Sequence, residues 1–212
     1  RVRLSFLPGV QAPSAPGHED ALLSYERGGL GVLVARGRTS MYEGEAARSA
    51  TALARIASGA HLRAALLVTR ATPLRGSGDV AGGSAPGQVR VVADHLNVTG
   101  GSLFPAAGMV SVGWDARLTK RLGSLRGVSG SSVVALVPGP LRPSPAESHA
   151  LASLGADAAV TDSVAEAMIL AARGVAVSAL TYLDAPAVGG NLGHAQLSLR
   201  QASGVTLAAV EE

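Results

Sequence analysis

Short apolar runs rich in valine and alanine alternate along the chain with longer stretches of helical pattern. Each apolar run is bounded by Gly, Pro or Asp. Runs this short are typical of buried strands. This alternation predicts an α/β domain with a largely parallel sheet. The expected strands are residues 2–6, 32–35, 64–69, 89–93, 133–137, 158–161 and 175–181, and the expected helices are residues 45–58, 114–125, 145–154, 164–173 and 193–210.

Two of the expected helices carry an explicit start signal. Ser144 with Glu147, and Ser163 with Glu166, both match the capping box, in which two side chains satisfy unpaired backbone amides reciprocally. Between the elements, residues 70–88 and 183–193 are rich in Gly, Pro and Ser. Loops this long inside a compact domain are usually functional or mobile, so we expect a ligand beside these two segments.

Composition narrows the function classes. With 212 residues, 47% of them hydrophobic, the chain can form one domain with a full core. It has no cysteine, which excludes thiol catalysis and thiolate metal sites. Its apolar runs fall far short of the ~20 residues that cross a bilayer, and nothing after Arg1 reads as a secretory signal, so we expect a cytoplasmic protein. A net charge of +3 and 3% aromatic residues do not favour a nucleic-acid partner.

Generic motifs for a bound cofactor or metal are absent from the sequence. There is no G-x-x-x-x-G-K-[ST], no H-E-x-x-H and no G-x-S-x-G, and residues 127–131 lack only the final glycine of the last of these. The five histidines show no metal-ligand spacing. We therefore expect neither a metal nor an organic cofactor.

A series of short motifs carries the functional signal. In chain order they are PGH at 16–18, GRTSMYEG at 37–44, DHLN at 94–97, GP at 139–140, LGADA at 154–158, and Ser163 with Glu166. Over nearly the whole chain, their order and spacing resemble the trimeric purine nucleoside phosphorylases and their methylthioadenosine phosphorylase relatives. GRTSMYEG is the most specific and resembles that family's G-R-F-H-M-Y-E-G. The resemblance implies a single nucleoside phosphorylase-like α/β domain over residues 1–212, with a mixed twisted central sheet flanked by helices.

Carried over by position, the resemblance implies a phosphate site. The residues on its phosphate-binding positions are His18, Arg38, Ala71 (through its backbone amide) and Ser163. An arginine fork binds two phosphate oxygens at once, and a serine at a helix start adds a hydroxyl and backbone amides. Tyr42 and His194 fall on the positions that hold the sugar, and they are the catalytic candidates. The resemblance implies no cofactor, only inorganic phosphate as co-substrate or ligand.

The positions that contact the base in that family are replaced. Where the family has a phenylalanine and a glutamate on the purine, this chain has Arg142 and Pro143. Tyr182 replaces an asparagine that stabilises charge on the leaving base, and Ser40 replaces the histidine of F-H-M-Y-E-G. Losing one such donor typically costs ~10²–10³ in rate, so two losses would nearly silence purine chemistry. Asp162 is a candidate contact to a different base.

Three interpretations of function stay open at this point. The first is a nucleoside phosphorylase. The second is a catalytically impaired relative that serves as a binding or assembly subunit beside an active homologue. The third is an enzyme with a changed substrate, in which the region of Arg70 and Arg142 accepts a more acidic or unusual base.

Taken singly, the candidate residues also have simpler explanations. His18 can be a loop histidine, Arg38 a solvated cation, and His194 an exposed helix residue. Tyr42 and Glu43 can pack and pair at a turn. The DHLN motif is expected to be structural, fixing a turn after a strand through Asx-type hydrogen bonds.

The first ten residues do not match the start of the related family. That family begins with a strand and a Gly/Ser-rich turn that closes over phosphate, and residues 1–10 show neither pattern. A domain without the first strand would have an open sheet edge, which a partner tends to cover. We therefore expect a homotrimer, as the resemblance implies, or a mixed oligomer with a homologue.

Overall fold

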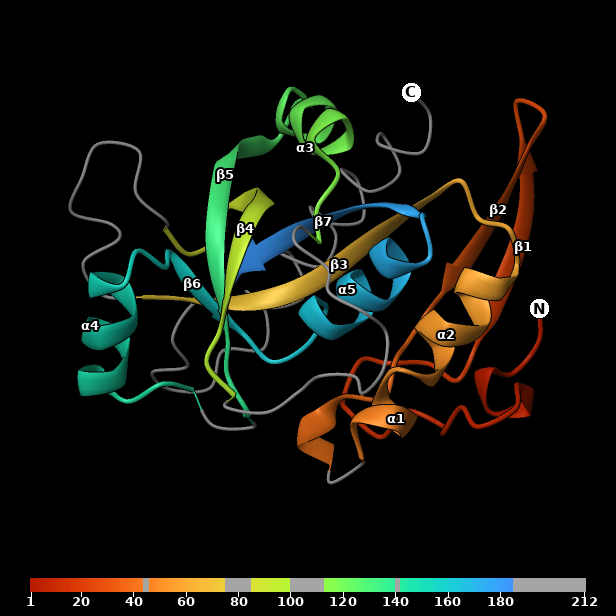
Figure 1. Ribbon diagram of the computed structural model, residues 1–212, viewed down its shortest axis with the longest axis horizontal. Helices are drawn as coiled ribbons and strands as arrows, with labels where there is room; N and C mark the ends of the chain where they lie inside the picture. Colours follow the sequence, from red (N-terminus) through yellow and green to blue (C-terminus); the bar gives the residue numbers. More distant parts are fainter. Residues whose placement is uncertain (44–45, 75–84, 100–112, 140–141, 185–212) are drawn as a thin grey trace.

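Two long parallel strands run through the centre of the molecule. The structure, a computed structural model, describes residues 1–43, 46–74, 85–99, 113–139 and 142–184. In it, β3 (Ala64–Pro73) and β7 (Ala176–Leu183) pair in parallel along their length. Figure 1 shows this pair crossing the middle of the fold.

Three further strands close the sheet into a barrel. β4 (Val89–Asn97), β5 (Val128–Leu136) and β6 (Ala158–Val160) complete the order β3-β6-β5-β4-β7. The pairs β4–β5 and β5–β6 are parallel, whereas β3–β6 and β4–β7 are antiparallel. The expected mixed sheet is therefore confirmed. Because β6 pairs with β3 and closes the order on itself, the barrel formed by the described residues does not have the open edge that we expected.

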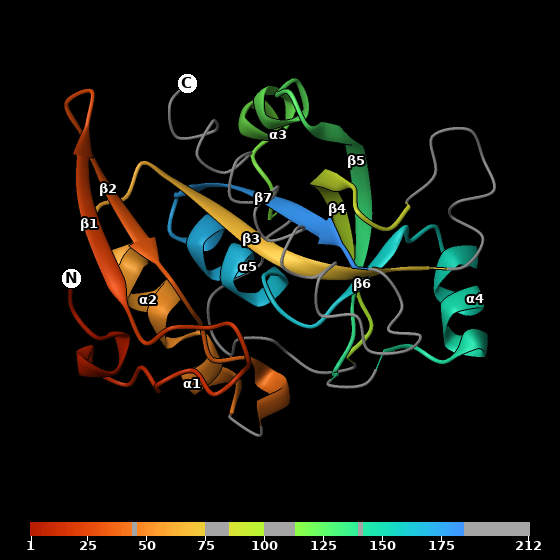
Figure 2. The ribbon, with the colours of Figure 1, turned by 180° about the vertical axis from the view of Figure 1, so that it is seen from behind.

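Helices pack on separate sides of this barrel, as expected. α5 (Val164–Ala172) lies along β3 and β7 and contacts α2 (Ala52–Gly59), while α3 (Ala116–Gly123) covers another side and α4 (Pro145–Ser153) lies at one end (Figures 1 and 2). Ile169 and Leu170 of α5 share the largest apolar cluster with Val177 and Leu183 of β7. In the part of the chain that the structure describes, every helix is too short or too polar to span a bilayer.

One of the two expected capping boxes is confirmed. The Glu147 amide donates to the Ser144 hydroxyl oxygen at 3.3 Å, and the Ser144 amide donates to the Glu147 carboxylate at 2.7 Å. The second predicted capping box, at Ser163 and Glu166, is wrong. Ser163 has a φ of +70°, which is unusual for a serine, and its hydroxyl donates to the Asp162 carbonyl oxygen instead of capping α5. The carboxylate of Glu166 is turned toward an arginine, as described below.

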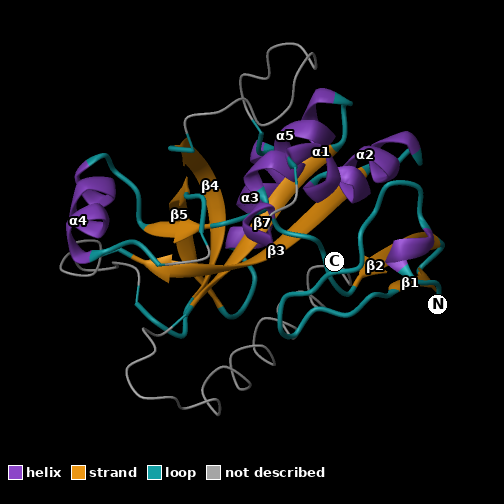
Figure 3. Ribbon diagram, turned by 90° about the horizontal axis from the view of Figure 1, so that it is seen from below, coloured by secondary structure: helices purple, strands orange, loops and turns teal. Residues whose placement is uncertain are grey.

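The N-terminal region differs from its prediction. Residues 2–6 do not form a strand, because Leu4–Phe6 is a 3-10 helix (η1) whose Ser5 donates from its amide and its hydroxyl to the Asp20 carboxylate. An unpredicted strand, β1 (Leu22–Arg27), pairs with β2 (Leu30–Ala35) in an antiparallel hairpin. Figure 3 shows this hairpin at the opposite end from α4. The polar residues of β1 and its exposure hid it from a search for buried apolar runs.

Other boundaries shift without changing the fold. The helix expected at 45–58 divides into α1 (Ala47–Ala50) and α2 at Thr51, whose hydroxyl donates to the Ala47 carbonyl oxygen at 2.5 Å. β3 and β5 are longer than predicted. The DHLN motif ends β4, and its Asn97 side chain accepts from the Thr99 amide and hydroxyl, so its structural role is confirmed. The helix expected at 193–210 lies outside the described residues.

Candidate functional site

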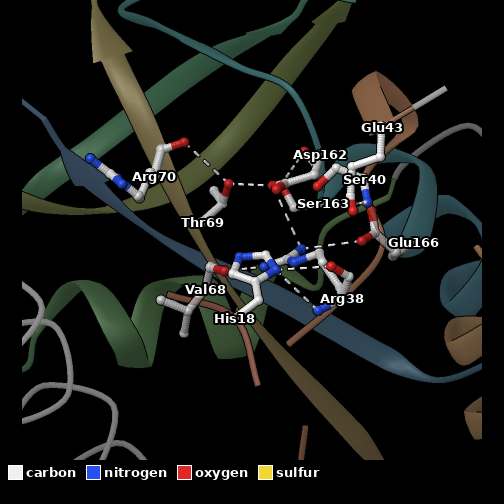
Figure 4. Close-up of polar contacts among 10 residues, drawn as sticks. All are labelled: His18, Arg38, Ser40, Glu43, Val68, Thr69, Arg70, Asp162, Ser163 and Glu166. Carbon is white, nitrogen blue, oxygen red and sulfur yellow. Dashed lines mark hydrogen bonds and ion pairs between the residues drawn. The ribbon is translucent and has the colours of Figure 1, made fainter. Parts of the chain in front are cut away.

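A mostly buried arginine brings together side chains from distant parts of the chain (Figure 4). Arg38 follows β2, and its side chain is 18% exposed, so it is not a solvated cation. Its Nη1 lies 3.2 Å from Oε1 of Glu166 on α5 and 3.6 Å from Oδ1 of Asp162, which follows β6. Its Nη2 donates to the carbonyl oxygen of Val68 on β3. We call Arg38, Asp162 and Glu166, with the groups that touch them, the Arg38 cluster.

The charges of this cluster perturb one another. Burial alone would lower the pKa of Arg38, but the charges of Asp162 and Glu166 outweigh it and raise that pKa above its ordinary value. Burial raises the pKa of Glu166, the Arg38 charge opposes this, and the Asp162 charge adds to it, so the net direction is upward. One guanidinium thus serves two carboxylates within a poorly solvated space.

Two further side chains hold the cluster in place. Nδ1 of His18 lies 2.9 Å from the Arg38 carbonyl oxygen and 3.3 Å from the Arg38 amide nitrogen, so the ring is fixed on the backbone of Arg38 and not on its guanidinium. The hydroxyl of Thr69 on β3 donates to Oδ1 of Asp162. These contacts fix both the arginine and one of its carboxylates.

A buried hydroxyl lies beside the cluster without a hydrogen bond. Ser40 is 1% exposed, and its Oγ has no hydrogen-bond partner among the described residues. Its backbone amide is satisfied, because it donates to Oε1 of Glu43 at 2.6 Å. Figure 4 shows this hydrogen bond between Ser40 and Glu43. A buried unpaired hydroxyl costs free energy, so it is available to a further hydrogen-bonding group.

The turn that follows Arg38 is stabilised by its glutamate. In the 3-10 helix η2 (Met41–Glu43), the Glu43 carboxylate accepts from the amides of Ser40 and Ser14 and from the Ser14 hydroxyl. Burial raises the pKa of Glu43, but these hydrogen bonds outweigh it and lower the pKa overall. The simpler explanation of Glu43, that it stabilises a turn through its own hydrogen bonds, therefore accounts for its presence. Tyr42 lies next to Gly139, since a Cβ added at Gly139 would stand 3.3 Å from the Tyr42 Cβ.

One position expected to contact a base, Arg142, lies in a second charged group. Arg70 on β3 and Arg142 both bond to the carboxylate of Asp184, which follows β7, and the Arg142 Nη2 lies 3.1 Å from its Oδ2. The Arg70 and Arg142 side chains are 55% and 37% exposed. Pro143, which follows Arg142 in sequence, is half-buried. This exposed group carries two positive charges around one negative charge.

Tyr182 is not part of either group. Its residue is 6% exposed and belongs to an apolar cluster with Val89 and Val91 of β4 and Leu122 of α3. This position, expected to contact a base, is therefore occupied by a core residue. Filling it with a ring stabilises the contact between α3 and the barrel.

The structure brings together part of the expected site. His18, Arg38 and Asp162 converge, and Ser163 is adjacent, completely buried. Ala71 lies two residues beyond Thr69 on β3, and its carbonyl oxygen accepts from the Asp184 amide at 2.8 Å. His194 lies outside the described residues. Within those residues, no group of three or more His, Cys, Asp or Glu side chains is placed to hold a metal ion.

Sequence comparison identifies the family. No protein-family model matches the chain. The chain is 34% identical over 196 residues to a purine nucleoside phosphorylase of Mycobacterium leprae, which covers 90% of this chain and 71% of the relative. It is 34% identical over 207 residues to the purine nucleoside phosphorylase of Mycobacterium tuberculosis, covering 94% and 74%. The chain belongs to the purine nucleoside phosphorylase family.

Structural comparison agrees on the fold. A purine nucleoside phosphorylase of Schistosoma mansoni in complex with inosine superimposes with a TM-score of 0.78 at 20% identity, covering 100% of this chain and 83% of that one. A Schistosoma purine nucleoside phosphorylase in complex with guanosine gives a TM-score of 0.76 at 19% identity. This chain is thus a purine nucleoside phosphorylase-like protein with the family's fold.

Sequence reasoning missed several partners in this purine nucleoside phosphorylase-like site. Glu166 was interpreted as a cap, Thr69 as an ordinary strand residue, and Asp162 as a contact to the base. A polar threonine near the end of a buried strand was the available signal for Thr69, because its hydroxyl needs a partner. The convergence of Asp162 and Glu166 on Arg38, which is more than 120 residues away in the chain, had no local signal.

Proposed function

We propose that this chain binds inorganic phosphate and a nucleoside at the Arg38 cluster and cleaves the N-glycosidic bond by phosphorolysis. A phosphate oxygen forms a bond to the anomeric carbon, the bond from that carbon to the base nitrogen breaks, and its electron pair leaves with the base, which takes up a proton. The observation that carries the proposal is the convergence of Arg38, His18 and Ser163 from three separate segments.

Each residue has a role in this proposal. Arg38 offers its guanidinium to phosphate, His18 fixes the backbone from which Arg38 extends, and Ser163 and the Ala71 amide are further phosphate donors. Tyr42 and His194 hold the sugar and keep its anomeric carbon in reach of the phosphate. Holding phosphate and nucleoside in this way converts a reaction between two free molecules into an effectively unimolecular reaction inside one complex.

The second candidate is a family member with impaired purine chemistry that acts as a binding or assembly subunit. The observation that favours it is the placement of Tyr182 in the core and of Pro143 and Arg142 at the base positions. Proline offers no side-chain hydrogen bond, and a tyrosine ring fills the space of an amide and offers only its one hydroxyl as donor to a leaving base.

The experiment that separates the candidates is phosphorolysis of inosine and guanosine by the purified chain in millimolar phosphate, followed by release of free base. Turnover at ~1 s⁻¹ or faster, within the ordinary range for enzymes, supports the first candidate. No turnover, combined with a higher melting temperature in nucleoside or phosphate, supports the second because ligand binding to the folded state stabilises it. An Arg38→Gln variant serves as the control for turnover that comes from a contaminating enzyme.

Assembly and location are part of the same proposal. A cytoplasmic homotrimer, or a mixed oligomer with an active homologue, is what the family relationship supports. Light scattering after gel filtration gives the mass of the assembly. A monomer that does not associate with a homologue when the two are co-expressed would contradict this part of the proposal.

A further inference from the structure

The carboxylate of Asp162 forms an ion pair with the guanidinium of Arg38, as a bound anion would. Its Oδ1 is 3.6 Å from Nη1 of Arg38 and accepts a hydrogen bond from the Thr69 hydroxyl. A phosphate at an arginine takes the same kinds of contact, from a guanidinium and from hydroxyl donors. Figure 4 shows the Asp162 carboxylate between Thr69 and Arg38.

The charge count of the cluster opposes a second anion. Arg38 contributes one positive charge, and Asp162 and Glu166 contribute two carboxylates. All three side chains are less than 20% exposed, so water screens them poorly. With both carboxylates ionised, a phosphate would enter a region whose net charge is already negative.

The turn that follows Arg38 contains a hydroxyl without a partner among the described residues. Ser40, two residues after Arg38, is buried, and its Oγ has no hydrogen-bond partner in the part of the chain that the structure describes. A tetrahedral anion has more oxygens than a carboxylate and so can use an additional donor. The site therefore combines an internal carboxylate with a hydroxyl that this carboxylate leaves unsatisfied.

We propose that Asp162 is an internal anion that occupies Arg38 and competes with inorganic phosphate for it. Asp162 then determines how strongly the cluster binds phosphate, and phosphate binding requires the Asp162 side chain to release the guanidinium. The inference rests on the proposed function only in taking Arg38 as the phosphate ligand, and it does not depend on catalysis.

The test is phosphate binding by the full chain, measured by equilibrium dialysis with inorganic phosphate and by the shift in melting temperature. Asp162→Asn keeps the shape of the side chain and an oxygen for Thr69 while it removes the charge. We expect this variant to bind phosphate on the order of tenfold more tightly or better than the wild type, from the loss of one like charge at close range. Asp162→Ser is a smaller second variant that is expected to change affinity in the same direction.

Two controls make the result specific to this site. Glu19→Gln removes the same charge from an exposed glutamate that pairs with Arg36 at 2.6 Å, and it is expected to leave phosphate affinity unchanged. Adding Ser40→Ala to Asp162→Asn is expected to reverse part of the gain, because it removes the spare hydroxyl. Sodium chloride at matched ionic strength replaces phosphate in a parallel series to measure simple screening.

The outcomes distinguish this inference from the proposed function. Tighter phosphate binding by Asp162→Asn, but not by Glu19→Gln, supports the inference whether or not inosine is cleaved. Equal phosphate affinity in the wild type and in both Asp162 variants overturns it, even where the wild type turns over inosine. A gain of the same size in Glu19→Gln also overturns it, because the effect would then come from net charge.

Discussion

The Arg38 cluster and the group around Asp184 contain the same kinds of side chains in different surroundings. In the first, one arginine serves two carboxylates, and all three side chains are less than 20% exposed. In the second, two arginines that are 55% and 37% exposed share one carboxylate. We propose the first as the phosphate site, and the second contains Arg142, a position that we expect to contact a base. The contrast teaches that one group buries a single arginine between two carboxylates, whereas the other leaves two arginines partly in solvent around one carboxylate.

Burial decides what each group contributes to stability. Exposed ion pairs contribute about 0–1 kcal/mol, because water and salt screen them and long side chains must be ordered. Removing one partner of a buried pair costs about 3–5 kcal/mol, because it leaves an uncompensated charge. The variants below follow that difference, in order of decreasing effect.

Arg38→Met is expected to be the most damaging change. It leaves the carboxylates of Asp162 and Glu166 facing each other in a poorly solvated space, and about 3 kcal/mol or more of unfolding free energy should be lost. Urea unfolding followed by circular dichroism measures the loss. The matched control is Arg36→Met, since Arg36 pairs with Glu19 at the surface and should cost less than about 1 kcal/mol. Equal losses of unfolding free energy in Arg38→Met and Arg36→Met would show that burial does not set the difference between the two ion pairs.

Tyr182→Asn restores the family's residue at a base position, yet we expect it to destabilise the protein. The ring packs with Val89, Val91 and Leu122, so replacing it with a small amide costs about 3 kcal/mol in lost packing and a buried polar group. Thermal unfolding measures the effect. Tyr25→Asn is the control, because Tyr25 is 53% exposed and should change stability only slightly. A stable Tyr182→Asn variant that gains purine phosphorolysis would show that this position still faces a base.

The contrast between the two groups marks the limit of prediction from sequence. Strands such as β6 and β7 were predictable because their apolar runs have a local signature, and the capping box at Ser144 was predictable because its partners are three residues apart. Part of β2 was predicted at residues 32–35, but its partner β1 was not, because most residues of β1 are exposed and several are polar. The positions of His18 and Arg38 followed from the family motifs. The carboxylates that pair with Arg38 could not be predicted from those motifs. The Glu166 carboxylate can either cap α5 or pair with an arginine, and the tertiary contact with Arg38 decides between these two roles.

Glu166→Gln tests the electrostatics of the buried group through pH. Burial raises the pKa of Glu166, against the opposing charge of Arg38, so the folded protein holds this proton more tightly than the unfolded chain does. As pH rises above the ordinary glutamate value of about 4.3, the unfolded chain loses the proton first and wild-type stability falls until pH passes the raised folded pKa. The Glu166→Gln variant has no carboxyl group at this position and so does not take part in this titration. We therefore expect the stability of the wild type relative to Glu166→Gln to decrease over that window, as measured by urea unfolding at a series of pH values.

A glutamate with the opposite shift is the control for this pH series. Hydrogen bonds from Ser144 lower the pKa of Glu147, so its contribution to stability is present above the ordinary pKa and is lost as pH falls through the lowered one. The stability of the wild type relative to Glu147→Gln should therefore increase with pH. The same slope for both glutamates would show that the surroundings of Glu166 do not raise its pKa.

Arg142→Ala is expected to have the smallest effect, below about 1 kcal/mol, because the side chain is exposed and Asp184 keeps its bond to Arg70. The same reasoning makes Arg70→Ala mild. Asp184 is only 14% exposed, however, so removing both arginines leaves a mostly buried carboxylate without either of them. The double variant should therefore lose more stability than the two single losses added together, and a double-mutant cycle in urea measures the excess. Strict additivity would mean that the two arginines do not share Asp184 in solution, and the exposed group would then be two separate surface charges.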